Sequence, residues 1–311
     1  MNTPYKYSIP LILFAITIGF TLNNHYGAAF LCFFSMFGFL FSLVFNIKNL
    51  EEEMESDPAN GTGFAKSIIS KKVSHVYYGD ELHFRNDELI AILNKRFAYF
   101  TTLTPLLQAR FLQRLKQFIG NKTFKIHGKE AYKEMPVLLS AAAIQLTFGL
   151  DKFLLPNFEF IHFYPEEFMR IEPTICFLEG NVSGHAINLS WKHFLAGYSN
   201  GNDGQNVGLH ELAHALYYQA FVTGDNIDPD FKTVYDNFIV DANKAYDAEK
   251  TLPGSLYSDY AVKNFQEFWA ESVEIFFEKP RQMKLTYPKL FSVLCDLLNQ
   301  DPENKISPIQ C

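Results

Sequence analysis

The sequence predicts a helix-rich α+β domain preceded by an N-terminal transmembrane helical hairpin. Two long apolar runs fill residues 7–45 and carry no Lys, Arg, Asp or Glu. After residue 64, segments with apolar residues at helical spacing outnumber those that alternate like strands. With 311 residues and 48% hydrophobic side chains, the chain can bury one substantial core.

The two apolar runs span residues 7–22 and 26–45. The second has 20 residues, which at about 1.5 Å each cross the roughly 30 Å hydrocarbon layer. A signal peptide is the alternative for the first, shorter run, but no small-x-small cleavage site precedes the second run. Buried core helices would show a polar face, which both runs lack. We therefore expect residues 1–48 to form a hairpin in a lipid bilayer.

Charges beside the hairpin predict its orientation. Lys6 and Lys48 lie outside the two spans, whereas the connecting loop has no Lys or Arg. The positive-inside bias then places both ends in the cytoplasm. Residues 49–64, with Glu, Asp, Pro, Asn and Gly, are typical of a linker, and residues 65–311 are expected to form one cytoplasmic domain.

The first half of this domain mixes helices and strands. Apolar residues at helical spacing over residues 87–119 predict amphipathic helices. Residues 135–150 are rich in Ala and Leu, which predicts a mostly buried helix that ends at Gly149. Residues 158–164 and 185–191 alternate as strands do.

The second half is predicted to be helical. Three helices are expected, over residues 207–221, over residues 230–250, and from 260 or 264 to 278. The turn Asp203-Gly204-Gln205-Asn206 supplies capping residues for the first helix. Pro253-Gly254 separates the second from the third, and Pro280 stops the third.

Composition excludes some classes of function. The net charge of -7 and the pI near 5.7 give no attraction to phosphate backbones, so no nucleic-acid partner is expected. The four cysteines have neither metal-type nor redox-type spacing, and we expect free thiols in a reducing compartment. A catalytic cysteine is the alternative, but apart from His185 nearby nothing marks Cys176 for that role.

Residues 210–214 read His-Glu-Leu-Ala-His and match the H-E-x-x-H pattern. The four-residue spacing puts His210 and His214 on one helical face, where both imidazoles can bind one zinc ion. Glu211 is displaced by about 100° around the helix, so its carboxylate can act on a water as general base and then donate the proton. Two ordinarily hydrogen-bonded histidines are the alternative, but the preceding cap and the surrounding apolar residues favour a buried metal site.

A catalytic zinc ion keeps three protein ligands and one open position, so a third ligand is required. Glu267, Glu271 and Glu274 share one face of the last predicted helix, among Phe and Trp side chains that leave little of the helix to solvent. A solvated acidic face is the alternative. Because a buried carboxylate needs a partner, at least one of the three should be paired or bind the metal.

An ordered series of short motifs covers most of residues 90–300. The series is Arg110-Phe111, Lys122-Thr123-Phe124, residues 140–150, Tyr164-Pro165, Leu189-Ser190-Trp191, residues 203–206, residues 210–214, Tyr260-Ala261, Glu267-Phe268-Trp269-Ala270 and Phe276-Phe277. In these motifs the chain resembles the Mlc titration factor A family of zinc peptidases, which are of the gluzincin type. Their active-site plan is similar to that of the anthrax lethal factor catalytic domain. The resemblance implies a zincin-like metallopeptidase domain with one zinc ion.

The resemblance also implies roles for residues of the last helix. The third ligand would be the glutamate seven residues after a tyrosine, here Glu267 after Tyr260. Tyr260 would donate a hydrogen bond to the oxyanion that forms at the scissile carbonyl, and Tyr257 is the local alternative. Glu271 and Glu274 would orient a histidine or pair with a buried donor.

Two features depart from the soluble bacterial members of the family. The chain adds the hairpin, and Ala215-Leu216 replaces a Lys-Leu-Asp end of the motif; neither change removes a ligand. We therefore expect an enzyme anchored in the bacterial inner membrane that hydrolyses a peptide or protein substrate by a zinc-activated water. The alternative is a membrane-tethered protein that binds and sequesters a transcriptional regulator, since the best-known partner in the family is a repressor of sugar uptake.

Residues 180–191 precede the motif, where zinc peptidases of this plan have a strand along the cleft. We expect this strand to bind an extended peptide by edge pairing, and a plain core strand is the alternative. His185 or Asn188 would then lie near the substrate, whereas His193 is expected to be structural.

Overall fold

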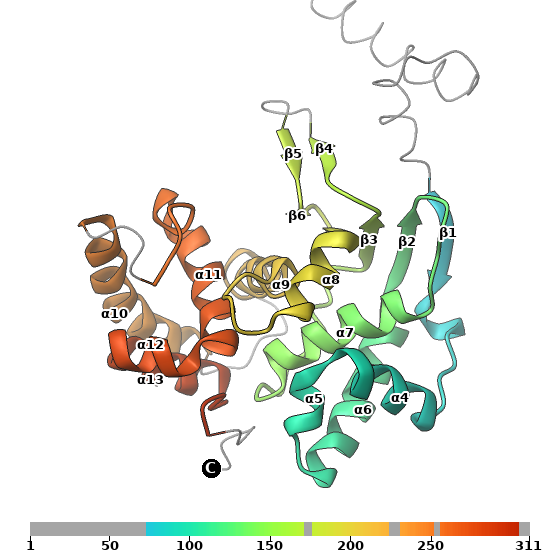
Figure 1. Ribbon diagram of the computed structural model, residues 1–311, viewed down its shortest axis with the longest axis horizontal. Coiled ribbons are helices and arrows are strands. Elements are labelled where there is room, and N and C mark those ends of the chain that lie inside the picture. The colour runs from blue at the N-terminus through green and yellow to red at the C-terminus, as the bar shows by residue number, and fades with distance from the viewer. Residues whose placement is uncertain (1–72, 171–175, 224–230, 252–255, 305–311) are drawn as a thin grey trace, which may run out of the picture. The chain divides into compact units, whose positions relative to one another are not determined.

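A computed structural model describes residues 73–170, 176–223, 231–251 and 256–304 of the chain (Figure 1). The predicted hairpin, residues 1–48, and the predicted linker, residues 49–64, lie outside the described residues. Within the described ranges, no helix has both the length and the hydropathy needed to span a bilayer.

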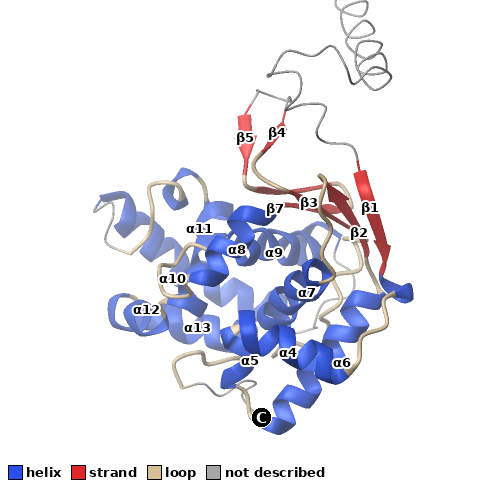
Figure 2. Ribbon diagram, turned by 45° about the vertical axis from the view of Figure 1, so that its right-hand side comes forward, coloured by secondary structure: helices blue, strands red, loops and turns tan. Residues whose placement is uncertain are grey.

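A mixed five-stranded sheet with the strand order β1-β2-β3-β7-β6 lies along one side of the helices (Figure 2). Its strands, in that order, are Val73–Tyr78, Thr123–His127, Phe160–Tyr164, Ala186–Ser190 and Gly180–Ser183. β2, β3 and β7 are parallel, and β1 and β6 are antiparallel to their neighbours. The register sets Ile161 beside Phe124 and Ile187, so buried apolar side chains share the face that meets the helices. A separate hairpin pairs β4 (Phe168–Arg170) with β5 (Cys176–Leu178).

Helices make up most of the remaining described residues. They are α4 (Asn86–Arg96), α5 (Ala98–Thr102), α6 (Pro105–Gly120), α7 (Glu134–Thr147), α8 (Trp191–Ser199), α9 (Val207–Tyr218), α10 (Phe231–Thr251), α11 (Phe265–Glu278), α12 (Pro280–Thr286) and α13 (Pro288–Leu298). The predicted helix-rich α+β class is therefore confirmed for the described part of the chain.

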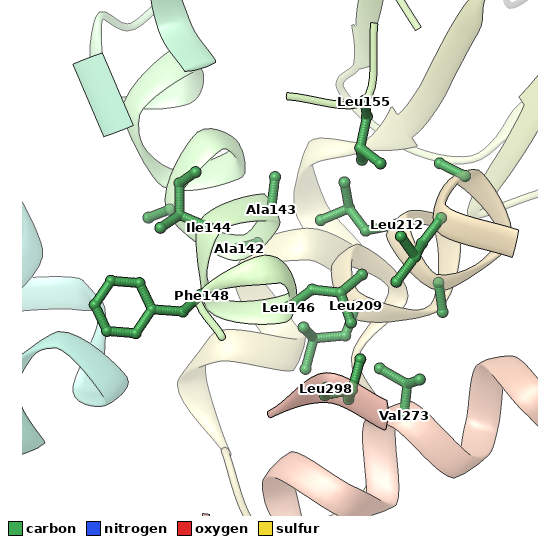
Figure 3. Packing of buried hydrophobic residues seen from close by; sticks show 14 of the residues in the cluster. Ala142, Ala143, Ile144, Leu146, Phe148, Leu155, Leu209, Leu212, Val273 and Leu298 are labelled. Carbon is green, nitrogen blue, oxygen red and sulfur yellow. The ribbon is translucent and has the colours of Figure 1, made fainter. Parts of the chain in front are cut away.

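Helix α7 forms the centre of the core, and every one of its residues from Met135 to Thr147 is buried. It packs against α6 on one side and α9 on the other, and Figure 3 shows side chains of α7 close to Leu209 and Leu212 of α9. Burying a Leu or Phe side chain contributes roughly 1.5–3 kcal/mol. This packing fixes the position of α9, the helix that carries the H-E-x-x-H motif.

Several predicted boundaries shift for local reasons. Residues 87–119 form three helices, and the third, α6, begins where the Thr104 side chain caps it and Pro105 occupies its first turn. The start of the last predicted helix, left open above, is Phe265, since the Asn264 side chain accepts hydrogen bonds from the amides of Gln266 and Glu267. Pro280 follows the end of α11 and also opens α12.

Other elements were not predicted. The motif helix ends at Tyr218 and continues as a π-helical turn, Gln219–Thr223. The second predicted strand ends at Ser190, whose side chain caps α8, a helix that the sequence did not indicate. Strands β1, β2, β4 and β5 and helices α12 and α13 are also additions.

Candidate metal centre

Helix α9 directs two histidines to the same side. Its N-cap is Asn206, whose side chain accepts a hydrogen bond from the Leu209 amide at 3.1 Å. The opposite face carries Leu209 and Leu212, both fully buried in the core. The histidine side chains, His210 and His214, keep 16% and 20% exposure, so one face of the helix is open to a ligand.

Helix α11 packs beside α9 and supplies the third donor. Phe268, Trp269 and Val273 are fully buried and fix the face that α11 turns to the core. The Trp269 indole donates a hydrogen bond to the Ala213 carbonyl of α9 at 2.9 Å, which joins the two helices directly. Glu267, in the first turn of α11, is thereby brought to His210, 57 residues earlier in the chain.

Three side-chain atoms converge between these helices. Glu267 Oε2 lies 3.0 Å from His210 Nε2 and 3.4 Å from His214 Nε2. The two imidazole Nε2 atoms are 3.2 Å apart. Two imidazole nitrogens and one carboxylate oxygen are a donor set that first-row divalent metals accept, and three protein donors leave coordination positions open. We call His210, His214 and Glu267 the donor triad; its residues fit a bound metal ion.

Glu274 orients the first histidine. Its Oε1 lies 2.7 Å from His210 Nδ1, and its other oxygen accepts a hydrogen bond from the Asn206 amide. A carboxylate on Nδ1 fixes the imidazole so that Nε2 faces the metal position. Burial lowers the pKa of His210, but hydrogen bonds to Glu267 and Glu274 outweigh burial and raise it to about 10. The triad therefore favours a positive charge, which a proton provides in the ion-free chain and a metal cation would provide when bound.

Glu211 lies beside the donor triad and is not part of it. Its side chain is 6% exposed and lines the same cleft as His210. Burial raises the pKa of Glu211 to about 8. The strand β6 passes so close that a Cβ on Gly180 would lie 2.5 Å from Glu211 Cγ, which explains a glycine at that position.

The two tyrosines that the sequence left as alternatives differ in exposure. Tyr260 is 47% exposed, and its ring centroid lies 6.3 Å from that of His210. Tyr257 is buried, stacks on Phe268 at 4.4 Å and holds its hydroxyl 2.9 Å from Ser272 Oγ. Of the two, Tyr260 is the more exposed, and its ring lies near His210 of the donor triad.

The cleft beside the donor triad has a volume of about 740 Å³. One wall contains Glu179 and Gly180, at the start of β6, and another contains Ser258 and Tyr260. β6 is the outer strand of the five-stranded sheet as far as the structure describes it. The predicted strand over residues 180–191 is thus two antiparallel strands, β6 and β7, with β6 nearer the cleft.

The other histidines and Asn188 lie in different surroundings. Asn188 is buried on β7 and its amide donates to Ser183 Oγ at 3.2 Å, so it ties β7 to β6. His185 is exposed, with Nδ1 2.9 Å from the Asn157 carbonyl. The contacts of His193 with Glu167 and Glu179 were not predicted.

His193 belongs to a second group of possible metal donors, Glu167, Glu179 and His193, which we call the rim group. Its imidazole Nε2 lies 3.1 Å from a Glu167 oxygen and 3.3 Å from a Glu179 oxygen. The Lys192 ammonium lies 3.8 Å from the same Glu167 oxygen, so a cation already stands beside these carboxylates.

Comparison with known proteins agrees with the geometry. Residues 81–298 match the family described as glucose-regulated metallo-peptidase M90. A similar protein, uncharacterized protein slr2042 of Synechocystis sp. (strain ATCC 27184 / PCC 6803 / Kazusa), is 27% identical over 233 residues, which are 66% of this chain and 80% of that protein. The family match spans both α9 and α11 and confirms the resemblance to the Mlc titration factor A peptidases. The chain therefore belongs to the glucose-regulated metallo-peptidase M90 family, whose name implies a metal ion and peptide hydrolysis.

Proposed function

We propose that the chain hydrolyses peptide bonds with one zinc ion held by His210, His214 and Glu267. The observation that carries the proposal is the convergence of three donor atoms, within 3.4 Å of one another, from two helices joined in the core. Two histidines and one glutamate are a ligand set of catalytic zinc, which keeps an exchangeable position. A structural site is usually closed by four protein ligands and has no use for a base beside it.

The ion, when bound, would supply a Lewis acid that acidifies water and polarises the peptide carbonyl. Glu211 is the general base: it takes the proton of the attacking water and then gives it to the leaving amine. Its burial keeps the pKa near 8 in the ion-free chain, and a cation at the donor triad favours the ionised form. The carboxylate can then both accept and release a proton near neutral pH.

Tyr260 is the donor to the developing oxyanion. Tyr260 lines the same cleft as His210 and Glu211, and 47% of the residue is exposed. A hydrogen bond that strengthens as negative charge forms on the carbonyl oxygen lowers the barrier more than it strengthens substrate binding.

The substrate would be an extended peptide that pairs with β6. The outer edge of a strand offers backbone amides and carbonyls to a further strand, and β6 starts at Gly180, directly beside Glu211. A peptide paired there would present its backbone carbonyls to the base and to the donor triad. Gly180 has no Cβ, so the backbone of β6 can lie directly beside the Glu211 carboxylate.

We place this activity at the bacterial inner membrane, with the peptidase domain in the cytoplasm. The support is the pair of apolar runs over residues 7–22 and 26–45 together with Lys6 and Lys48 outside them. Capture and sequestration of a transcriptional regulator is the alternative function, and it does not require Glu211.

One substitution tests the function. Glu211→Gln in the full chain should keep one zinc ion per chain, by metal analysis, and abolish cleavage of a peptide library. Glu179→Gln is the matched control, because Glu179 lines the same cleft without joining the donor triad. Cleavage by Glu211→Gln at the parental rate would refute the role of the base, and partner capture by that variant in cells would support the alternative.

A further inference from the structure

We propose that Glu271 is a positioning residue that holds the Tyr260 phenol over the donor triad through Ser258. The inference rests on the proposed function of Tyr260 and extends it, because it names the group that places this tyrosine. Tyr260 lies in a short segment, residues 256–263, that lines the cleft before α11 begins.

The connection runs through a single side chain. Glu271 Oε1 accepts a hydrogen bond from the Ser258 amide at 2.5 Å, and Oε2 accepts one from the Ser258 hydroxyl at 2.6 Å. The Ser258 hydroxyl oxygen in turn accepts a hydrogen bond from the Tyr260 amide at 3.2 Å. A hydroxyl can donate once and accept as well, so these contacts are compatible. One carboxylate therefore fixes the backbone on both sides of Asp259.

Burial makes this connection strong. Glu271 is 8% exposed, and a carboxylate removed from water requires hydrogen-bond donors. The amide and the hydroxyl of Ser258 supply two such donors. Tyr260 itself is 47% exposed, with the Lys263 ammonium 4.0 Å from its ring. The hydrogen bonds from Glu271 through Ser258 fix the backbone at Tyr260, from which the ring extends beside the cleft.

Three carboxylates of α11 make different contacts in the site. Glu267 belongs to the donor triad, Glu274 contacts His210, and Glu271, between them, accepts hydrogen bonds from the amide and the hydroxyl of Ser258. Their spacing places all three on one face of the same rigid helix. Loss of Glu271 should consequently disturb the tyrosine and leave the metal in place.

A double-mutant cycle in the full chain tests the inference. Tyr260→Phe should lower kcat about 100-fold, as the loss of one oxyanion donor does. Glu271→Ala should lower kcat roughly 10- to 100-fold, with little change in KM and with one zinc ion retained. The double variant should be no slower than Tyr260→Phe alone, because Glu271 acts through that phenol.

Glu278→Ala is the matched control. Glu278 lies on the same helix, is 7% exposed and accepts hydrogen bonds from the Gly204 amide and the Asn206 side chain, outside the tyrosine segment. Any loss of kcat that Glu278→Ala causes, expressed as a free energy, should add to the loss caused by Tyr260→Phe. Additive losses for Glu271→Ala as well would overturn the inference, and so would a Tyr260→Phe variant as fast as the parent.

A second measurement does not depend on activity. Amide hydrogen exchange in the metal-free chain should quicken at residues 256–263 in Glu271→Ala, and to a smaller extent in Ser258→Ala, which keeps the bond from the Ser258 amide to Glu271. Unchanged exchange in Glu271→Ala would overturn the connection. If the parent cleaves no peptide, the proposed function fails, while faster exchange would still support the contact between Glu271 and Ser258.

Discussion

The donor triad and the rim group contain the same kinds of donor atom at nearly the same separations. Contacts in the donor triad range from 3.0 to 3.4 Å, and those from His193 to the two rim carboxylates are 3.1 and 3.3 Å. Their surroundings differ, because the Glu267 side chain is 17% exposed and that of Glu179 is 57% exposed. We expect the donor triad, and not the rim group, to hold a metal ion, because other buried side chains keep the donors of the triad in place.

Other side chains hold the donors of the donor triad in place. Glu274 fixes the His210 imidazole, and the Trp269 indole joins the two helices that carry the triad. In the rim group, the Ser190 hydroxyl lies 2.8 Å from His193 Nδ1. The two carboxylates, Glu167 just before β4 and Glu179 just after β5, have side chains that are 35% and 57% exposed. Preorganised donors bind a metal more tightly than mobile ones, because less freedom is lost on binding.

The largest expected effect is the loss of bound zinc when a histidine of the donor triad, but not of the rim group, is replaced. His210→Ala should reduce bound zinc from one ion per chain to near none and abolish peptide cleavage, since two ligands cannot hold a catalytic ion. His193→Ala should leave zinc content at one. Metal analysis after dialysis measures both; equal losses in the two variants would show that the rim group holds metal as well.

The next effect is on stability. Trp269→Ala should destabilise the metal-free chain by about 3–5 kcal/mol, because a fully buried indole leaves a cavity and the bond to α9 is lost. Phe177→Ala on β5, where the ring is 61% exposed, should change stability by less than about 0.5 kcal/mol. Urea unfolding measures both changes in the free energy of unfolding. Similar values for the two variants would contradict the contrast between the buried helix α11 and the exposed strand β5.

A smaller effect is expected from the residues that contact the Nδ1 atoms of His210 and His193. Glu274→Gln should weaken zinc binding about 10- to 100-fold, as does the loss of a carboxylate that hydrogen-bonds the second ring nitrogen of a metal-binding histidine. Ser190→Ala, which removes the partner of His193 Nδ1, should leave zinc affinity unchanged. Competition with a chromophoric chelator measures the affinity; a Glu274→Gln variant with parental affinity would remove the reason for preferring the donor triad.

The smallest effect concerns pH. The pKa of His210 is raised to about 10 in the ion-free chain, so below that pH a proton competes with zinc for the imidazole. Apparent zinc affinity should then rise with pH between 6 and 8, by about tenfold per unit for each proton displaced. His193→Ala should keep the same slope. An affinity that is flat or falls over this range would contradict the raised pKa.

Local features of the sequence were enough to predict the helix of the motif and its two histidines. The cap at Asn206 and the four-residue histidine spacing depend only on neighbours in the chain. The contact of Glu271 with Ser258 and the closeness of Gly180 to Glu211 were not predicted, because both arise when distant segments pack. Strand β6 was not separated from β7, since four residues with Asn and Ser give no clear alternation. Glu267 was identified through the family resemblance, because carboxylate spacing alone left three candidates.

We expect α11 to complete the metal site through Glu267, and we expect this site to hydrolyse peptides. The most direct test measures zinc content and peptide cleavage together in the parent chain and in Glu267→Ala. We predict one zinc ion and cleavage in the parent, and loss of both in the variant. A zinc-free parent that still cleaves, or a Glu267→Ala variant that keeps its zinc and its rate, would contradict the claim.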